Sequence, residues 1–386
     1  MSALSLVFSG AAAIFEDPLT ILYFLIGVFG GIVFGAIPGL TGALGVSLML
    51  PFTFAMSPTQ GITVLIGIYV GGVSGGLIAS IMLNIPGNAA AIVTCFDGSP
   101  MARNGHPYRA LSYGATASLI GGLFSGVVMI FVATKLARFG LMFGAWEYFA
   151  LGIMGLAVVI SLCSDDMIKG LISAIIGMML AMIGMDKLSS LERFTFGWWR
   201  LSGGFGEMTV LMGLFALGEI LSQLKNLGKP MKQVGSDERK TVLPRKGAFK
   251  GLKKTLCVSS VIGTLIGVLP GVGQSTAALV AYNQAKNSSK EPEKFGTGCA
   301  EGIVAPESAN NAVCGGALIP MMTLGIPGDT ITAMLMSGLI VHGLAPGASL
   351  FSIDVRRCVH DVFGNQPRAG GKLQNRLDFH DRSDQL

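Results

Sequence analysis

Long apolar runs follow one another along most of this chain, separated by short polar stretches. The clearest of them are Leu19–Ile37, Gly61–Leu83, Tyr113–Thr134, Tyr148–Cys163, Ile168–Gly184, Met208–Leu221, Leu256–Leu269, Ala312–Leu324 and Ile331–Leu344. A helix that crosses a bilayer needs about 20 apolar residues, and several of these runs are shorter. The pattern predicts an all-α, polytopic membrane protein with some broken or tilted helices, because one soluble domain could not bury so many apolar runs.

One apolar pattern that contains glycine and proline occurs twice, once in each half of the chain. The segment Gly31-Ile-Val-Phe-Gly-Ala-Ile-Pro-Gly39 matches Gly263-Thr-Leu-Ile-Gly-Val-Leu-Pro-Gly271. Further along, Leu83-Asn-Ile-Pro-Gly-Asn88 matches Leu324-Gly-Ile-Pro-Gly-Asp329. Paired hydrophobic segments that are interrupted at corresponding positions are typical of secondary transporters, whose substrate site lies where the helices break.

The length of the first copy also requires a break. Residues 19–56 would form a helix about 57 Å long at about 1.5 Å per residue, whereas the hydrocarbon core of a bilayer is only about 30 Å thick. We therefore expect the Pro38-Gly39 pair to join either two spans or a span and a re-entrant half-helix.

Charge is scarce and unevenly placed. Charged residues make up 13% of the chain, and the mean hydropathy is +0.64. Soluble domains carry about 25% charged residues, so the composition agrees with a membrane protein. The first Lys or Arg is Arg103, whereas segment 225–254 contains ten. Because positive charge in short loops marks the cytoplasmic side, we expect 225–254 in the cytoplasm and the N-terminus outside.

This placement gives the two copies opposite directions. The first copy starts outside and returns outside at the turn Ser57–Gln60, which has no Lys or Arg. The second copy starts from the basic loop and returns to the cytoplasm at Lys286–Lys294. The sequence therefore predicts inverted-topology repeats.

The expected organisation has five parts. They are an N-terminal segment (1–18), a first transmembrane repeat region (19–224), a basic cytoplasmic loop (225–254), a second, incomplete transmembrane repeat region (255–351) and a polar tail (352–386). The tail holds six Lys/Arg and five Asp in 35 positions, against 38 charged residues in the preceding 351. It is interpreted either as a solvated cytoplasmic tail or, as we favour, as the product of a frameshift or truncation that replaced further membrane helices. No removable signal peptide is expected.

The Pro-Gly pairs and the polar residues around them are the candidate binding site. Each break frees N–H and C=O groups that a membrane tolerates only inside the protein or along a wet cavity. Helix N-termini can then hold an anion, and freed carbonyls can hold Na⁺. A simple kink or interfacial turn is the alternative. The predicted substrate-binding residues are Pro38, Gly39, Thr41, Asn84, Pro86, Gly87, Asn88, Pro270, Gly271, Gln274, Asn310, Asn311, Pro327 and Gly328.

Two acids are candidates for coupling to Na⁺ or protons. Glu307 and Asp329 are the only acids beside the second pair of breaks. The alternative for each is a solvated acid at a helix cap, since Asp329 stands at a natural helix start after Pro327-Gly328. No Lys or Arg lies in either break region, so backbone N–H groups and amides would have to hold an anionic substrate.

Other kinds of chemistry find little support. The six cysteines are scattered without a C-x-x-C pair, so we predict no zinc site and no disulfide framework. No P-loop, dinucleotide fingerprint or metalloprotease motif is present, which disfavours an ATP-driven pump or a zinc protease. An intramembrane hydrolase is an alternative, but its base would have to be His106 or His342, and neither has a convincing Ser or Asp partner. No cofactor is expected apart from a coupling ion.

Taken together, the motifs resemble the large membrane subunit of the tripartite tricarboxylate transporters, the TctA family. The resemblance covers residues 15–350 and rests on Gly35–Gly42, Asn84–Asn88, Gly267–Gly271, Ala305–Ala312 and Leu324–Asp329. It implies a bacterial inner-membrane permease that imports small carboxylates such as citrate with an ion gradient. It also implies two partners, a small TctB-like membrane subunit and a periplasmic TctC-like solute-binding protein. Family members continue with further hydrophobic segments where this chain enters its polar tail, so a non-functional transporter fragment is the alternative.

Overall fold

The structure, a computed structural model, describes residues 12, 14–37, 40–140, 167–185, 191–205 and 247–351, with isolated residues between 142 and 153. Pro38, Gly39, the predicted tail and most of the predicted basic loop lie outside the described residues. The helices are α2 (Pro18–Ala36), α3 (Gly42–Thr53), α4 (Pro58–Leu83), α5 (Thr94–Arg103), α6 (Pro107–Gly140), α8 (Met167–Ala181), α11 (Lys253–Val268), α12 (Gly273–Ser288), α13 (Glu301–Leu324) and α14 (Thr330–Val341). Short 3-10 turns are η1 (Ala89–Ile92), η2 (Trp199–Leu201), η4 (Pro292–Lys294) and η5 (Ala348–Phe351).

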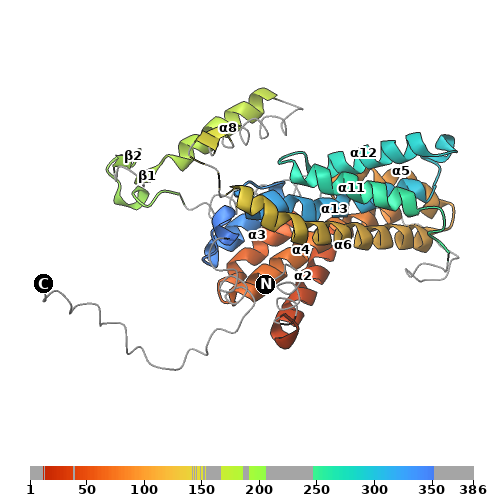
Figure 1. The fold of residues 1–386 in the computed structure, drawn as a ribbon, viewed down its shortest axis with the longest axis horizontal. Coiled ribbons are helices and arrows are strands. Elements are labelled where there is room, and N and C mark those ends of the chain that lie inside the picture. Colours follow the sequence, from red (N-terminus) through yellow and green to blue (C-terminus); the bar gives the residue numbers. More distant parts are fainter. Residues whose placement is uncertain are drawn as a thin grey trace, which may run out of the picture.

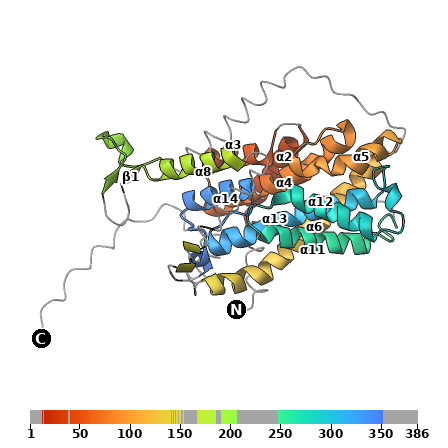
Figure 2. The ribbon, with the colours of Figure 1, turned by 90° about the horizontal axis from the view of Figure 1, so that it is seen from above.

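Strand structure in the described part of the chain is confined to one small hairpin. Strand β1 (Gly184–Met185) pairs antiparallel with β2 (Glu192–Arg193). The hairpin lies at one end of the molecule, beyond the packed helices (Figures 1 and 2). Helices α6, α11, α12 and α13 run side by side along the long axis in both views, and α2 packs along α4. The predicted all-α fold class is therefore confirmed.

The surface of the helices suits a lipid environment. Helices α2 and α4 and the stretch Pro107–Arg138 of α6 are long and apolar enough to cross a membrane. Large apolar side chains point outward on several helices: Phe29 is 70% exposed, Leu119 61% and Leu265 62%. A soluble protein rarely exposes contiguous apolar surface on this scale, so the molecule is a multi-pass membrane protein.

Local chemistry explains where the first helices begin and end. Asp17 caps α2 by accepting a hydrogen bond from the Leu19 N–H (3.1 Å), and the helix stops at Ala36, just before the Pro38-Gly39 pair. Ser57 and Gln60 form a capping box at the start of α4. Between them, α3 has only 12 residues, about 18 Å at about 1.5 Å per residue. This half-length helix agrees with the predicted break and with a re-entrant second part.

The two copies of the sequence pattern make matching contacts. A side chain at Gly35 of α2 would collide with the backbone of Gly72 on α4. A side chain at Gly267 of α11 would collide with the backbone of Val313 on α13. Gly267 lies 232 positions after Gly35, and Val313 lies 241 positions after Gly72. The same two offsets relate the contact of Gly31 with Ile68 to that of Gly263 with Ala309, and the contact of Gly75 with Ile32 to that of Gly316 with Thr264. The pair α2 and α4 and the pair α11 and α13 are therefore two copies of one packing unit.

The ends of the two long helices match as well. Asn84 ends α4 in the left-handed conformation (φ 56°), and Gly325 ends α13 in the same way (φ 71°). The capping N–H groups donate to the carbonyls of Ala79 and Pro320 respectively. The offset of 241 positions holds for both pairs, which extends the repeat through the helix ends.

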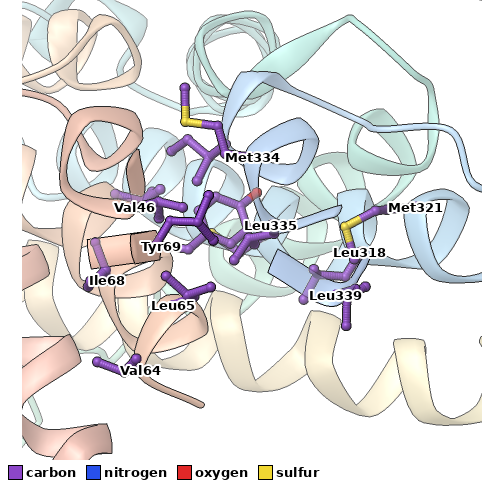
Figure 3. Close-up of a cluster of buried hydrophobic side chains, with 14 residues drawn as sticks. Val46, Val64, Leu65, Ile68, Tyr69, Leu318, Met321, Met334, Leu335 and Leu339 are labelled. Carbon is purple, nitrogen blue, oxygen red and sulfur yellow. The ribbon is translucent and has the colours of Figure 1, made fainter. Parts of the chain in front are cut away.

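Helices α4 and α13 cross in opposite directions. Leu65, near the start of α4, shares an apolar cluster with Met321, near the end of α13 (Figure 3). Leu77, near the end of α4, shares a second cluster with Ile303, near the start of α13. Helices α4 and α13, the equivalent members of the two copies, therefore pack against each other antiparallel.

Candidate functional site

The two Pro-Gly breaks of the second half meet directly. Helix α11 ends at Val268, and Gly271 then adopts φ 78°, a conformation that favours glycine. The N–H of Gly271 donates to the C=O of Gly328 at 2.9 Å. Pro270 and Pro327 each precede one partner of this bond, so the structure brings these four predicted residues together.

The described break of the first half has the same setting. Gly87 is buried and packs against the backbone of Gly35 and Gly76. Gly328 packs in the same way against Gly267 and Ala317. Pro86 directly precedes Gly87, and the partners Pro38 and Gly39 lie outside the described residues. Gly87 and Gly328 therefore each pack against small residues where the two long helices of their own copy meet.

Asn88 and Asp329, equivalent residues of the two copies, both cap helix starts and both reach the middle of α4. Asn88 accepts a hydrogen bond from the Ala91 N–H at 3.0 Å, and its Nδ2 donates to the Gly72 carbonyl at 3.1 Å. Asp329 accepts from the Thr332 N–H at 2.7 Å in a capping box at the start of α14. Asn88 thus bonds to Gly72 of α4, and Asp329 bonds to Tyr69, one turn earlier on the same helix.

Asp329 joins three helices through its second oxygen. Tyr69 of α4, which is fully buried, donates its hydroxyl to Asp329 Oδ2 at 2.7 Å. Gln274 of α12 donates its Nε2 to the same oxygen at 3.2 Å. The carboxylate is therefore both a helix cap and the centre of a polar network. Gln274 was predicted from the sequence, whereas Tyr69 was missed because it lies inside a continuous apolar run.

Thr41 and Asn84 have local roles at helix ends. Thr41 caps α3 by accepting a hydrogen bond from the Leu44 N–H at 3.1 Å. Asn84 is exposed at the left-handed end of α4, where Asn and Gly are the favoured residues. The structure does not bring Asn84 into the buried polar cluster.

A second polar group lies on α13. Asn311 accepts a hydrogen bond from Ser74 of α4 at 2.7 Å, and its Nδ2 donates to Asn310 Oδ1 at 3.1 Å. Asn310 is 0% exposed, and its Nδ2 has no hydrogen-bond partner among the described residues. Buried amide donors are nearly always paired, so the Asn310 Nδ2 is available to an acceptor such as a water or a ligand oxygen.

Glu307, one turn before Asn311, is also 0% exposed. Its carboxylate accepts hydrogen bonds from Thr94 at 2.6 Å and from Ser118 of α6 at 2.9 Å. Both partners are uncharged hydroxyls. Burying an acid in a membrane protein costs free energy, so an acid found there is a candidate functional residue. Thr94 and Ser118 were not predicted, since their distance from Glu307 in the sequence hides the contact.

Asp97, a buried acid outside the predicted set, links the two halves through hydrogen bonds. Asp97 of α5 accepts hydrogen bonds from the backbone N–H groups of Gly296, Gly298 and Cys299 at 2.8–3.0 Å and from the Tyr282 hydroxyl at 2.9 Å. This Asp97 clasp ties α5 of the first copy to the loop before α13. One signal was present in the sequence, because Asp97 is the only acid between Asp17 and Glu147.

Two copies of one helical unit, each interrupted at Pro-Gly pairs, in a multi-pass membrane protein are typical of membrane transporters. Among the described residues, no cluster of His, Cys, Asp or Glu is arranged to hold a metal ion. Residues 21–361 match the model of the tripartite tricarboxylate transporter TctA family, and the chain belongs to this family. It is thus a membrane subunit of a tricarboxylate transporter.

Two proteins of Agrobacterium vitis are similar to this chain. An "uncharacterized 52.8 kDa protein in TAR-I ttuC' 3'region" is 35% identical over 352 residues, which covers 91% of this chain and 69% of the relative. An "uncharacterized protein in TAR-II ttuC' 3'region" is 43% identical over 80 residues, which covers 21% of this chain and 33% of that protein. No solved structure matches.

Proposed function

We propose that this chain is the permease subunit of a binding-protein-dependent secondary transporter that imports small, tricarboxylate-like anions with an ion gradient. Its partners are a small TctB-like membrane subunit and a periplasmic TctC-like solute-binding protein, in the inner membrane of a bacterium. Membership in the TctA family supports this role. The coupling ion is Na⁺ or H⁺.

The antiparallel packing of the two copies supports inverted-topology repeats. In transporters of this kind, one repeat rocks against the other around a site near the bilayer midplane. Here the breaks at Asn88 and Asp329 are both fastened to the middle of α4, whose residues run from 58 to 83. The site would then open alternately toward each side as the copies move.

The orphan Nδ2 donor of Asn310 is the observation that carries the substrate assignment. It is buried beside Asn311, and the break regions contain no Lys or Arg that could neutralise a carboxylate. A carboxylate oxygen supplies the missing acceptor, and the helix N-termini after the breaks each contribute about 0.3–2 kcal/mol toward an anion. Affinity from such groups is modest, so the binding protein supplies capture and specificity.

Glu307 and Asp329 are the residues we assign to ion coupling. Glu307 is buried between two hydroxyls, and Asp329 lies within the network of Tyr69 and Gln274. The carboxylate and hydroxyl oxygens around each acid are hard ligands of the kind that Na⁺ prefers. Each acid can instead carry a proton. A co-bound cation would also offset the charge of a carboxylate substrate.

Uptake by proteoliposomes tests the proposed function. The chain is reconstituted with its membrane subunit and binding protein, and uptake of labelled citrate is measured under an imposed Na⁺ or pH gradient. We expect uptake at least tenfold above empty liposomes, lost when any one component is omitted or the gradient is collapsed. Uptake equal to that of empty liposomes, with all three components present and folded, would overturn the proposal.

A further inference from the structure

Contacts between the two copies come in matching pairs. Val93, in the segment after the Pro86-Gly87 break, shares an apolar cluster with Ala278 of α12. Met334 of α14, 241 positions after Val93, shares another cluster with Val46 of α3, 232 positions before Ala278 (Figure 3). Helix α12 accordingly contacts η1, and α3 contacts α14. The two copies are therefore related by an approximate two-fold axis near the breaks, and a contact in one direction predicts its counterpart in the other.

The hydrogen bond between Tyr69 and Asp329 is one of these contacts between copies. At this Asp329 site, Tyr69 of α4 and Gln274 of α12 both donate to a carboxylate that the chain itself supplies. The residue 241 positions after Tyr69 is Asn310 of α13, and the residue 241 positions before Asp329 is Asn88. The two-fold relation therefore predicts that Asn310 and Asn88 face each other in a second site, the Asn88 site.

The Asn88 site differs from the Asp329 site because it contains no carboxylate of its own. The Oδ1 of Asn88 accepts from the Ala91 N–H, and its Nδ2 donates to the Gly72 carbonyl. Asn310 is 0% exposed, and its Nδ2 has no hydrogen-bond partner among the described residues. The donor that corresponds to the Tyr69 hydroxyl thus lacks the acceptor that a carboxylate provides in the other copy.

We propose that a carboxylate group of the transported anion binds at the Asn88 site and accepts a hydrogen bond from the Nδ2 of Asn310. It takes the position that the Asp329 carboxylate fills in the other copy. This inference rests on the proposed function and deepens it, because it gives the two related sites different ligands. The uncharged Asn88 site holds the anion, whereas the acidic Asp329 site holds the coupling ion. An acid at both positions would repel the substrate.

Equilibrium binding of labelled citrate to the purified full chain tests this assignment. Asn310→Leu removes the unpartnered donor, so the Kd for citrate should rise at least tenfold. Asn88→Asp keeps a residue that caps a helix start and adds a negative charge, so it should abolish binding. The matched control is Ser259→Ala on α11. Ser259 is 0% exposed, and its Oγ also has no partner among the described residues, so this variant should leave the Kd within twofold.

The outcomes separate the Asn88 site from the proposed function. Citrate binding is measured with Na⁺ present, at acidic and at neutral pH, on variants that are monodisperse in detergent. If the unsubstituted chain binds citrate and both site variants bind it with a Kd within twofold, the Asn88 site is wrong and the proposed function stands. An equal loss of affinity in Ser259→Ala would also contradict the site. If the unsubstituted chain binds no citrate under any of these conditions, the proposed function and the site are both overturned.

Discussion

Asn84, a predicted substrate-binding residue, has a structural role at the end of α4. Its place in an Asn-Ile-Pro-Gly-Asn motif marked it as a candidate ligand, yet it is exposed and ends α4 at φ 56°. Gly325 occupies the equivalent position at the end of α13. Asn and Gly are the residues that accept this conformation readily, so the backbone gives a structural reason for the residue at this position.

Substitutions at Asn84 separate the two roles. Asn84→Leu should lower the free energy of unfolding by about 1–2 kcal/mol, since Leu is strained in the left-handed region, and should lower uptake with it. Asn84→Gly should preserve both, as Gly325 does in the other copy. Thermal unfolding in detergent and citrate uptake are the two measurements. If uptake fell in Asn84→Gly at full stability, the side chain itself would bind substrate.

The Asn310 donor gives a sharper test of substrate binding. Asn310→Leu removes the unpartnered Nδ2 and one hydrogen bond, the one that Asn310 Oδ1 accepts from Asn311 Nδ2, which also donates to the Glu307 carbonyl. The free energy of unfolding should therefore fall by only about 1 kcal/mol while uptake falls at least tenfold. Asn311→Leu breaks the bond to Ser74, so it should lower both stability and uptake. Ser74→Ala is the matched control for the stability loss. Normal uptake by a stable Asn310→Leu protein would rule out this residue as a ligand.

At the scale of elements, the helix breaks were predictable and the contacts between elements were not. Proline, glycine and capping residues act on their immediate neighbours, so the ends of α2, α4, α11 and α13 follow from a few residues each. The Asp97 clasp joins residues about 200 positions apart, and the Glu307 contacts are of the same kind. No local pattern records such pairs, which is why Tyr69, Thr94 and Asp97 were missed.

The Asp97 clasp can be opened by one substitution. Burial and the charge of Asp97 raise the pKa of the Cys299 thiol to about 12, so little of it is reactive thiolate near neutral pH. Asp97→Asn removes the charge and weakens the bonds that hold the loop, so the pKa falls and Cys299 should react with maleimide at least fivefold faster. Tyr282→Phe, which removes only one donor, should have a smaller effect. The assay uses a chain in which the other five cysteines are serine, and equal rates in all three proteins would contradict the clasp.

At the scale of the whole molecule, the repeat was visible in the sequence but its contacts were not. The sequence pattern pairs Gly35 with Gly267. Only the folded structure shows that Gly35 packs against Gly72 and that Gly267 packs against Val313. The orientation in the membrane remains a prediction from charge, because it depends on the uneven distribution of Lys and Arg about the bilayer and not on packing.

The central proposal is that two copies of one unit lie in opposite orientations in the membrane and build one site from the breaks of both. Accessibility of two single cysteines tests it most directly: Ala55→Cys in the loop before α4, and Lys290→Cys in the loop before α13, both exposed positions. In intact cells, a membrane-impermeant maleimide should label Ala55→Cys from outside and should reach Lys290→Cys only after lysis. Labelling of both cysteines from the same side of the membrane would contradict the account.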